Sequence, residues 1–140
     1  MITEAQDLII TRLETIEAVK QVDAWQGDIE DLLKKPQNMP ALWVIYQGCV
    51  FGKRKVIGAK IAPQDMRFMI ALFNKNLRGR RQGAEASYPI LESVHAKLIG
   101  YQVSTYGWLW PVREDLIHIG SAVLAYGMEY KITTDTTGGV

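Results

Sequence analysis

The hydrophobic residues at the start of the chain recur at steps of three and four, which is the period of an amphipathic helix. This spacing predicts a helix from about residue 4 to 20, with one apolar stripe formed by Ala5, Leu8, Ile9, Leu13, Ile16 and Val19. Thr3 followed by Gln6 has the form of a capping box at its start. Further on, the helix-capping residue Asp28 precedes several apolar positions and Pro36, so one short helical turn is expected there.

The middle of the chain changes to strand patterns. The aromatic and β-branched run at 41–47 predicts a largely buried strand, and 49–58 predicts a second, looser strand with a basic tip. Residues 66–73 are apolar on both alternation phases apart from Arg67. This pattern is typical of a central strand covered on both faces, which is expected to pair with the first strand.

A second helix and two more strands are predicted in the last third of the chain. Residues 74–83 indicate a loop, and Gly83 leads into a helix that ends at Gly100, with Pro89 in its first turn or two. The next strand covers 106–115 and is followed by a loop near Asp115. In this strand Trp108 and Trp110 share one face, and Pro111 argues for an edge position.

The final strand, at about 122–133, alternates between apolar and polar positions. The order of elements predicts an α+β fold, in which two helices pack on one face of a mainly antiparallel sheet of four to five strands. We expect a single domain over residues 1–133 and a flexible C-terminal tail at 134–140.

Composition limits the classes of protein that need considering. The chain has 140 residues, 48% of them hydrophobic, and its one cysteine, Cys49, excludes an internal disulfide. It has no apolar stretch of the roughly 20 residues that a membrane-spanning helix needs, and its start lacks the features of a secretory signal. No contact with a membrane is therefore expected, and the protein is predicted to be made in a cytoplasm.

The formal net charge of +1 conceals an uneven distribution of charge along the chain. The net charges of residues 1–35, 36–83 and 84–140 are −4, +8 and −3. A basic middle segment between acidic flanks fits a nucleic-acid surface, a surface that meets acidic patches on neighbouring subunits, or solvated loops. The basic loop tips hold Lys53, Arg54, Lys55, Arg78, Arg80 and Arg81.

The residues that usually perform catalysis are poorly placed for it. His95 lies on the apolar face of the second helix, His118 lies in a strand-like stretch, and Cys49 has no Cys-x-x-Cys partner. The glycines at 79–83 match neither a P-loop nor a dinucleotide fingerprint. Adjacent carboxylates normally point apart, so neither 30–31 nor 114–115 predicts an acid/base pair. The sequence therefore predicts no enzyme, no catalytic residue, no cofactor and no metal site.

The order of several short strings resembles a family of small virion proteins of Mu-like phages and prophages, encoded near the tail sheath and tube genes. The overall order of helices and strands is also similar to the tail-terminator fold of long-tailed phages. The strings are WQGD at 25–28, PALWVIYQG at 40–48, FNKNLRGRRQG at 73–83 and AYGMEYKITT at 125–134.

The resemblance implies a structural role in the virion, at the head-proximal end of the tail, after assembly in the host cytoplasm. Tail terminators form hexameric rings that cap the tail tube and sheath and meet the head–tail connector. In such a ring, the acidic first helix region of one copy would meet the basic loop from Arg78 to Arg81 of the next copy. The candidate acidic residues for such an interface are Asp23, Asp28, Glu30 and Asp31.

Three alternatives to this role stay open at the level of the sequence. The basic tips could line the lumen of the ring and touch passing DNA without sequence specificity. The chain could be a head-completion or neck connector protein. It could also bind nucleic acid outside a virion.

Overall fold

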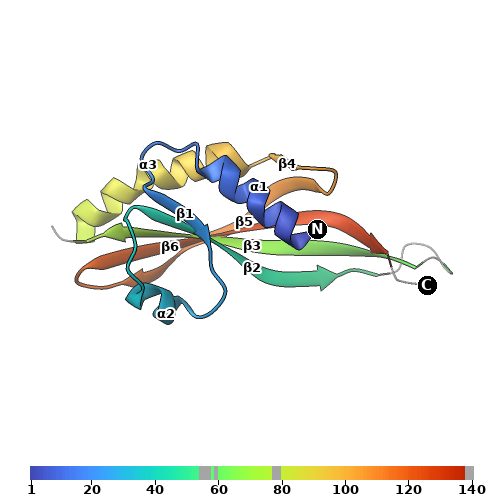
Figure 1. Cartoon of the computed structure of the whole chain (residues 1–140), viewed down its shortest axis with the longest axis horizontal. Helices are drawn as coiled ribbons and strands as arrows, with labels where there is room; N and C mark the ends of the chain where they lie inside the picture. Colours follow the sequence, from blue (N-terminus) through green and yellow to red (C-terminus); the bar gives the residue numbers. More distant parts are fainter. Residues whose placement is uncertain (54–57, 59, 77–79, 138–140) are drawn as a thin grey trace.

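A curled six-stranded sheet forms the centre of the computed structural model (Figure 1). The structure describes residues 1–53, 58, 60–76 and 80–137, with the backbone alone for residues 80 and 137. The strand order is β1-β2-β3-β6-β5-β4. The strands are β1 (Gln21–Ala24), β2 (Ala41–Phe51), β3 (Ile61–Lys75), β4 (Gln102–Val103), β5 (Gly107–Ile119) and β6 (Val123–Thr137). The helices are α1 (Ile2–Leu13), α2 (Ile29–Lys34) and α3 (Arg80–Leu98).

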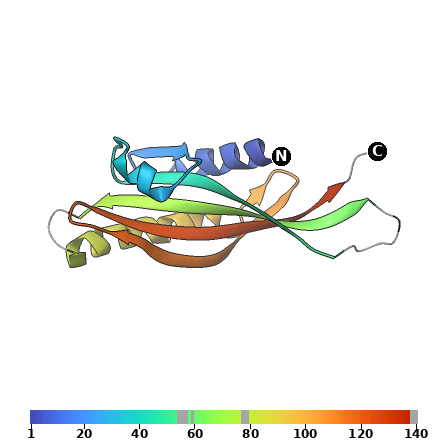
Figure 2. The same cartoon turned by 90° about the horizontal axis from the view of Figure 1, so that it is seen from below.

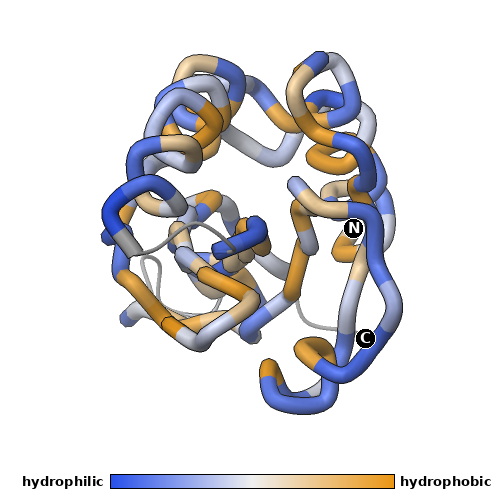
Figure 3. The backbone as a smooth tube through the Cα atoms, turned by 90° about the vertical axis from the view of Figure 1, so that its left-hand side faces the viewer, coloured by the Kyte–Doolittle hydropathy of each residue, from blue (hydrophilic) through white to orange (hydrophobic). Residues whose placement is uncertain are grey.

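The larger of two apolar cores lies between the sheet and the helices α1 and α3. Seen from the end of the molecule that carries α2, these helices lie above the sheet (Figure 3). Alternate residues of each strand point into this core, because successive side chains of a strand face opposite sides. Its largest wholly buried side chains are Ile9, Leu13, Leu42, Met66, Phe68, Ile70, Leu72, Leu98 and Tyr130.

The opposite face of the sheet is covered only in part. The short helix α2 packs there and closes a smaller core around Trp43, Phe73 and Leu32, all with an exposed fraction of 0%. The indole N–H of Trp43 donates a hydrogen bond of 2.8 Å to the Gln37 side chain, and Trp25 packs edge-on against the same ring. The rest of this face, along β3, β6 and β5, is the open sheet face.

The α+β class is confirmed, but the numbers of strands and helices are larger than predicted. The missed strand β1 runs parallel to β2, with Gln21 opposite Ala41, so the sheet is mixed. The added helix is α2, which forms where the short turn after Asp28 is expected and packs on the face opposite the other two helices. Four residues of strand and six of helix carry too few periods for either pattern to be read from sequence.

Two predicted boundaries in the first half of the chain are wrong. Helix α1 ends at Leu13 rather than near residue 20, yet Ile16 is still buried because a tight turn keeps the chain on the core. The first residues of the looser strand predicted at 49–58 continue β2 to Phe51, and residues 54–57 of that prediction lie outside the described residues. A bulge next to Gly48, whose φ is +109°, separates the two halves of that strand.

The second half of the chain also differs in detail from the prediction. Helix α3 begins at Arg80, so Pro89 lies in its interior rather than in its first turns. Strand β5 continues through Asp115 to Ile119, where a loop was expected. Its pairing with β4 is confined to two residue pairs, which leaves most of β5 at the sheet edge, as Pro111 predicts.

The predicted alternation of the last strand is confirmed. Met128, Tyr130 and Ile132 are buried in the core that α1 and α3 cover, and Leu124, on the same alternation phase, is buried as well. The strand runs to Thr137, four residues beyond its expected end, and pairs there with the start of β3. Part of the segment expected to be a flexible tail is thus strand, and residues 138–140 lie outside the described residues.

Candidate functional site

One end of the sheet projects beyond the helices as an arm, which we define as residues 50–53 and 60–65 (Figures 1 and 2). Just beyond Phe51, its two strands are joined by the backbone N–H of Gly52, which donates to the carbonyl oxygen of Pro63 at 2.8 Å. A Cβ atom at Gly52 would lie only 2.9 Å from the Pro63 ring, so the close approach requires glycine. The two strands of the arm are therefore closely joined at this point.

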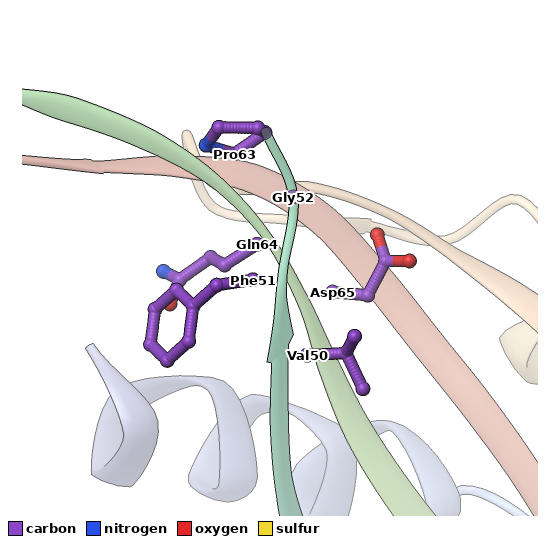
Figure 4. Close-up of a pocket in the computed structure, with 6 residues that line it drawn as sticks. All are labelled: Val50, Phe51, Gly52, Pro63, Gln64 and Asp65. Atoms are coloured by element: carbon purple, nitrogen blue, oxygen red, sulfur yellow. The ribbon is translucent and has the colours of Figure 1, made fainter. Parts of the chain in front are cut away.

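The arm exposes several apolar side chains. The exposed fractions are 54% for Val50, 62% for Phe51 and 41% for Ile61. Phe51 lies beside Gln64 on one side of the ribbon, and Val50 lies beside Asp65 on the other (Figure 4). Large apolar groups held this far out of a core add nothing to the packing of the folded chain, and clusters of them mark contact surfaces.

A groove of about 520 Å³ lies at the opposite end of the sheet, between α2 and the turn that joins β5 to β6. The turn is held by the N–H of Gly120, which donates to Val123 at 2.9 Å, and by the Asn76 side chain, which donates to the carbonyl oxygen of Gly120 at 2.8 Å. The groove is lined by Glu30, Leu33, Lys34, His118, Gly120, Ser121, Ala122 and Val123.

Three of the candidate acidic residues lie on or directly before α2, where Glu30 lines this groove, and the fourth, Asp23, lies on the edge strand β1. All four of them, Asp23, Asp28, Glu30 and Asp31, are exposed. Within the part of the chain that the structure describes, none of them forms an ion pair. Lys35 is directed to the Trp25 and Trp43 rings, 5.3 and 5.0 Å from their centroids, rather than to these carboxylates.

The candidate basic residues are only partly placed. Lys53 is exposed on the arm, at the far end of the molecule from α2. Arg81 is the second residue of α3, whose start lies at the same end of the molecule as α2, and it forms an ion pair of 2.9 Å with Glu85 one turn along its own helix. Arg54, Lys55, Arg78 and the side chain of Arg80 lie outside the described residues. The acidic residues around α2 and Arg81 thus lie toward the same end of the molecule, on opposite faces of the sheet, whereas Lys53 lies at the other end.

The open sheet face carries ion pairs across neighbouring strands, which sequence reasoning did not identify. Glu129, with an exposed fraction of 9%, lies 3.7 Å from both Arg67 and Arg113. Lys131 lies 3.9 Å from Asp65 on the same face. These charges are therefore compensated within the chain. In the sequence, charged residues at alternate positions, 65 and 67 in one strand and 129 and 131 in another, were the pattern that could have predicted these cross-strand pairs.

His95 takes part in a polar link between α3, β5 and β6. Its Nε2 lies 2.8 Å from the Glu114 carboxylate, and its Nδ1 contacts the Tyr130 hydroxyl. Because a carboxylate only accepts, Nε2–H is the donor, so in the neutral imidazole Nδ1 accepts from the hydroxyl. Burial, and secondarily the nearby Glu114 charge, raise the pKa of Tyr130 well above its usual value. The hydroxyl is wholly buried, so this link joins structural elements and offers no exposed nucleophile.

The other residues weighed for chemistry form no cluster of reactive groups among the described residues. Cys49 is partly buried, and its thiol lies 3.2 Å from the Gln64 side-chain oxygen. His118 lines the groove. Across the described ranges, no three metal-ligating side chains converge on one point. The described helices also include none with the length and apolar character to cross a bilayer.

Comparison with known proteins decides the family. The sequence profile described as "Phage tail terminator protein" matches residues 3–136, which is nearly the whole chain. The chain belongs to the phage tail terminator family. The resemblance to tail terminators seen in the sequence is confirmed, and the chain is a structural tail protein of the virion.

Among solved structures, this terminator-family chain is similar to a chain in one titled "Virion of native gene transfer agent (GTA) particle". The identity is 13%, the TM-score is 0.54, and the similarity covers 92% of this chain and 85% of that chain. At this level of identity the likeness shows that the fold is shared. A search among curated proteins found no match to the chain.

Proposed function

We propose that this chain is the tail terminator of a contractile-tailed, Mu-like phage or prophage. In this role it forms a hexameric ring at the head-proximal end of the tail, caps the tube and sheath, and meets the head–tail connector. The observation that carries the proposal is the family match over residues 3–136. The role requires binding surfaces on each copy, and it needs no catalytic residue.

The form of the molecule supports assembly into a ring. A ring needs two different complementary surfaces on each copy, because each copy contacts one neighbour ahead and another behind. The arm and the α2 end lie far apart along an elongated sheet (Figure 2). One carries an exposed base and the other carries exposed acids, so identical copies can meet through unlike surfaces.

Binding to tail tubes is the direct test of the proposed function. The purified chain is mixed with tubes assembled without it, and negative-stain images record where it attaches and with what symmetry. A six-fold ring on one end of each tube is the expected result. Attachment to the head connector alone would instead identify a head-completion protein, and binding to DNA without binding to tubes would identify a nucleic-acid-binding role.

Solution mass gives a second measurement on the same preparation. Light scattering at low and high salt is expected to show a species of about six subunits that weakens as salt screens the charges between copies. Lys53→Glu tests DNA contact separately. If the arm lined the lumen and touched DNA, this variant would cap tubes normally and reduce the transfer of DNA, whereas a role between copies requires that it weaken the ring.

A further inference from the structure

We propose that the arm of one copy docks into the groove between α2 and the β5–β6 turn of the next copy. The occupant of the groove is thus a second copy of this chain, and its exposed Phe51 is the central contact. This inference deepens the proposed function, on which it rests, by naming the two surfaces that join neighbouring copies.

The arm is already shaped for docking. The Gly52–Pro63 contact ties its two strands together just beyond Phe51, which limits the conformational freedom that is lost when the arm binds. Phe51 and Val50 stand out on opposite sides of the ribbon at exposed fractions of 62% and 54% (Figure 4). An aromatic ring that is rigidly presented and then buried in a partner is a frequent source of binding energy between proteins.

The groove has the chemistry to receive such a group. Leu33, Ala122 and Val123 supply apolar surface, while Glu30 and Lys34 stand at α2 beside it. The groove has a volume of about 520 Å³ and is open to solvent, so a side chain that projects from another copy can enter it. The hydrogen bonds of Gly120 and Asn76 hold the turn in place, so the groove is formed before any partner arrives.

Charge also favours this pairing. The α2 end presents exposed carboxylates at Asp28, Glu30 and Asp31 that lack an ion-pair partner among the described residues. Lys53 follows Phe51 by two residues and is exposed on the arm. Arg81, the other placed candidate base, is compensated by Glu85 within its own helix. Lys34 is exposed beside Glu30 in the groove lining, so the arm meets an excess of carboxylates over bases there rather than a purely acidic surface. Of the placed candidate bases, Lys53 is the one that forms no ion pair with the described residues of its own chain.

Geometry decides that the contact joins two copies. The arm and the groove lie at opposite ends of the long axis in both views (Figures 1 and 2). A chain cannot bring its own arm to its own groove without breaking the sheet between them. The same contact repeated from copy to copy is head-to-tail, and such contacts close into a ring when the rotation between copies allows.

The test uses two variants with exposed substitutions, each of which disables one end. Phe51→Ser removes the ring from the arm, and Ala122→Trp fills the groove. Light scattering over a concentration series at low salt is expected to show that each substitution weakens self-association by at least about tenfold. When the two variants are mixed, the intact arm of one still fits the intact groove of the other. The mixture is therefore expected to form heterodimers and to stop there.

Trp108→Ser is the matched control, because Trp108 has the same exposed fraction of 62% but lies on β5, outside the arm and the groove. Far-ultraviolet circular dichroism verifies that all variants fold. A charge exchange adds independent evidence: Lys53→Glu and Glu30→Lys each weaken association, and the double variant restores it in part.

Several results would overturn the inference. Among them are unchanged association of Phe51→Ser, a mixture that stays monomeric, a loss of association confined to Trp108→Ser, or a wild-type chain that stays monomeric at the highest concentration it reaches. None of these outcomes alters the tube-capping experiment. Tubes capped by a ring whose Phe51→Ser form assembles normally would reject the docking surfaces and retain the function, whereas failure to cap tubes would reject the function itself.

Discussion

Replacing Tyr130 with phenylalanine should change the pH dependence of stability in a way that a simple loss of packing does not. The hydroxyl is buried at an exposed fraction of 0% and contacts Nδ1 of His95, which is itself held by Glu114. Removing it costs one hydrogen bond to a partly exposed imidazole that water can re-solvate. Near neutral pH we expect the variant to be less stable by about 1 kcal/mol.

At alkaline pH this difference should shrink. Burial raises the pKa of Tyr130 in the folded protein well above the value of 10.0 that applies to the unfolded chain. The folded state then retains a proton that the unfolded state releases, so this stabilisation is complete below pH 10 and is lost as the pH rises. At one pH unit above 10 the wild type has lost about 1.4 kcal/mol through this residue, and the variant has lost none.

Urea unfolding of both proteins across the alkaline range measures the effect. The free energies of unfolding are expected to converge and to cross about half a pH unit above 10, so that one unit above pH 10 the wild type is the less stable protein by roughly 0.4 kcal/mol. Other tyrosines with raised pKa values, such as Tyr46 and Tyr126, are present in both proteins and cancel in the comparison. Two parallel curves would refute the reasoning, because they would mean that Tyr130 keeps an ordinary affinity for its proton in the fold.

Two other predictions concern the face of the sheet opposite α1 and α3. Trp43→Ala should lower the free energy of unfolding in urea by about 3–5 kcal/mol, because it empties a wholly buried site. Trp110→Ala, at an exposed fraction of 55%, should lower it by under about 0.5 kcal/mol. Equal losses from the two variants would contradict the different burial of the two side chains. Arg67→Ala and Arg113→Ala should each lower the free energy of unfolding by under about 1 kcal/mol. The double variant should lose roughly 1 kcal/mol more than the sum of the two, because only then does the nearly buried Glu129 carboxylate lack both of its arginine partners. Additive losses would show that water already solvates this carboxylate.

Periodicity located the elements whose environment is uniform along their length. The stripe of α1 and the alternation of β6 each face a single core, so the burial of Ile9 and Tyr130 follows from spacing alone. Strand β5 faces a changing environment, with register shifts between Pro111 and Arg113 and between Leu116 and His118. At each bulge, the set of alternate residues that points inward changes. No single two-residue period therefore describes the whole strand, and the sequence pattern predicts a loop for its second half.

The candidate site was predictable in its chemistry but not in its placement. Charge along the sequence separates acidic from basic segments, and the exposure of Glu30 and Lys53 agrees with surface roles. Their positions at opposite ends depend on β2 running the length of the sheet to the arm, which is a tertiary property. The pairing of Arg81 with Glu85 is local, at four residues along a helix, and was open to prediction once α3 was known to begin at Arg80.

The continuous pairing of β3 with β6 has a consequence for how such a molecule can change in size. The two strands pair over 15 residues without a register shift, from Ile61 opposite Thr137 to Lys75 opposite Val123, a span of about 50 Å. Removing one residue from each strand that enters the arm would move the side chains of the arm to the opposite face of the sheet. Removing two residues from each strand would return these side chains to their original face and shorten the molecule by about 7 Å. The reach between the two ends is therefore adjustable only in steps of two residues, and an assembly built end to end from this chain would change its circumference in the same steps.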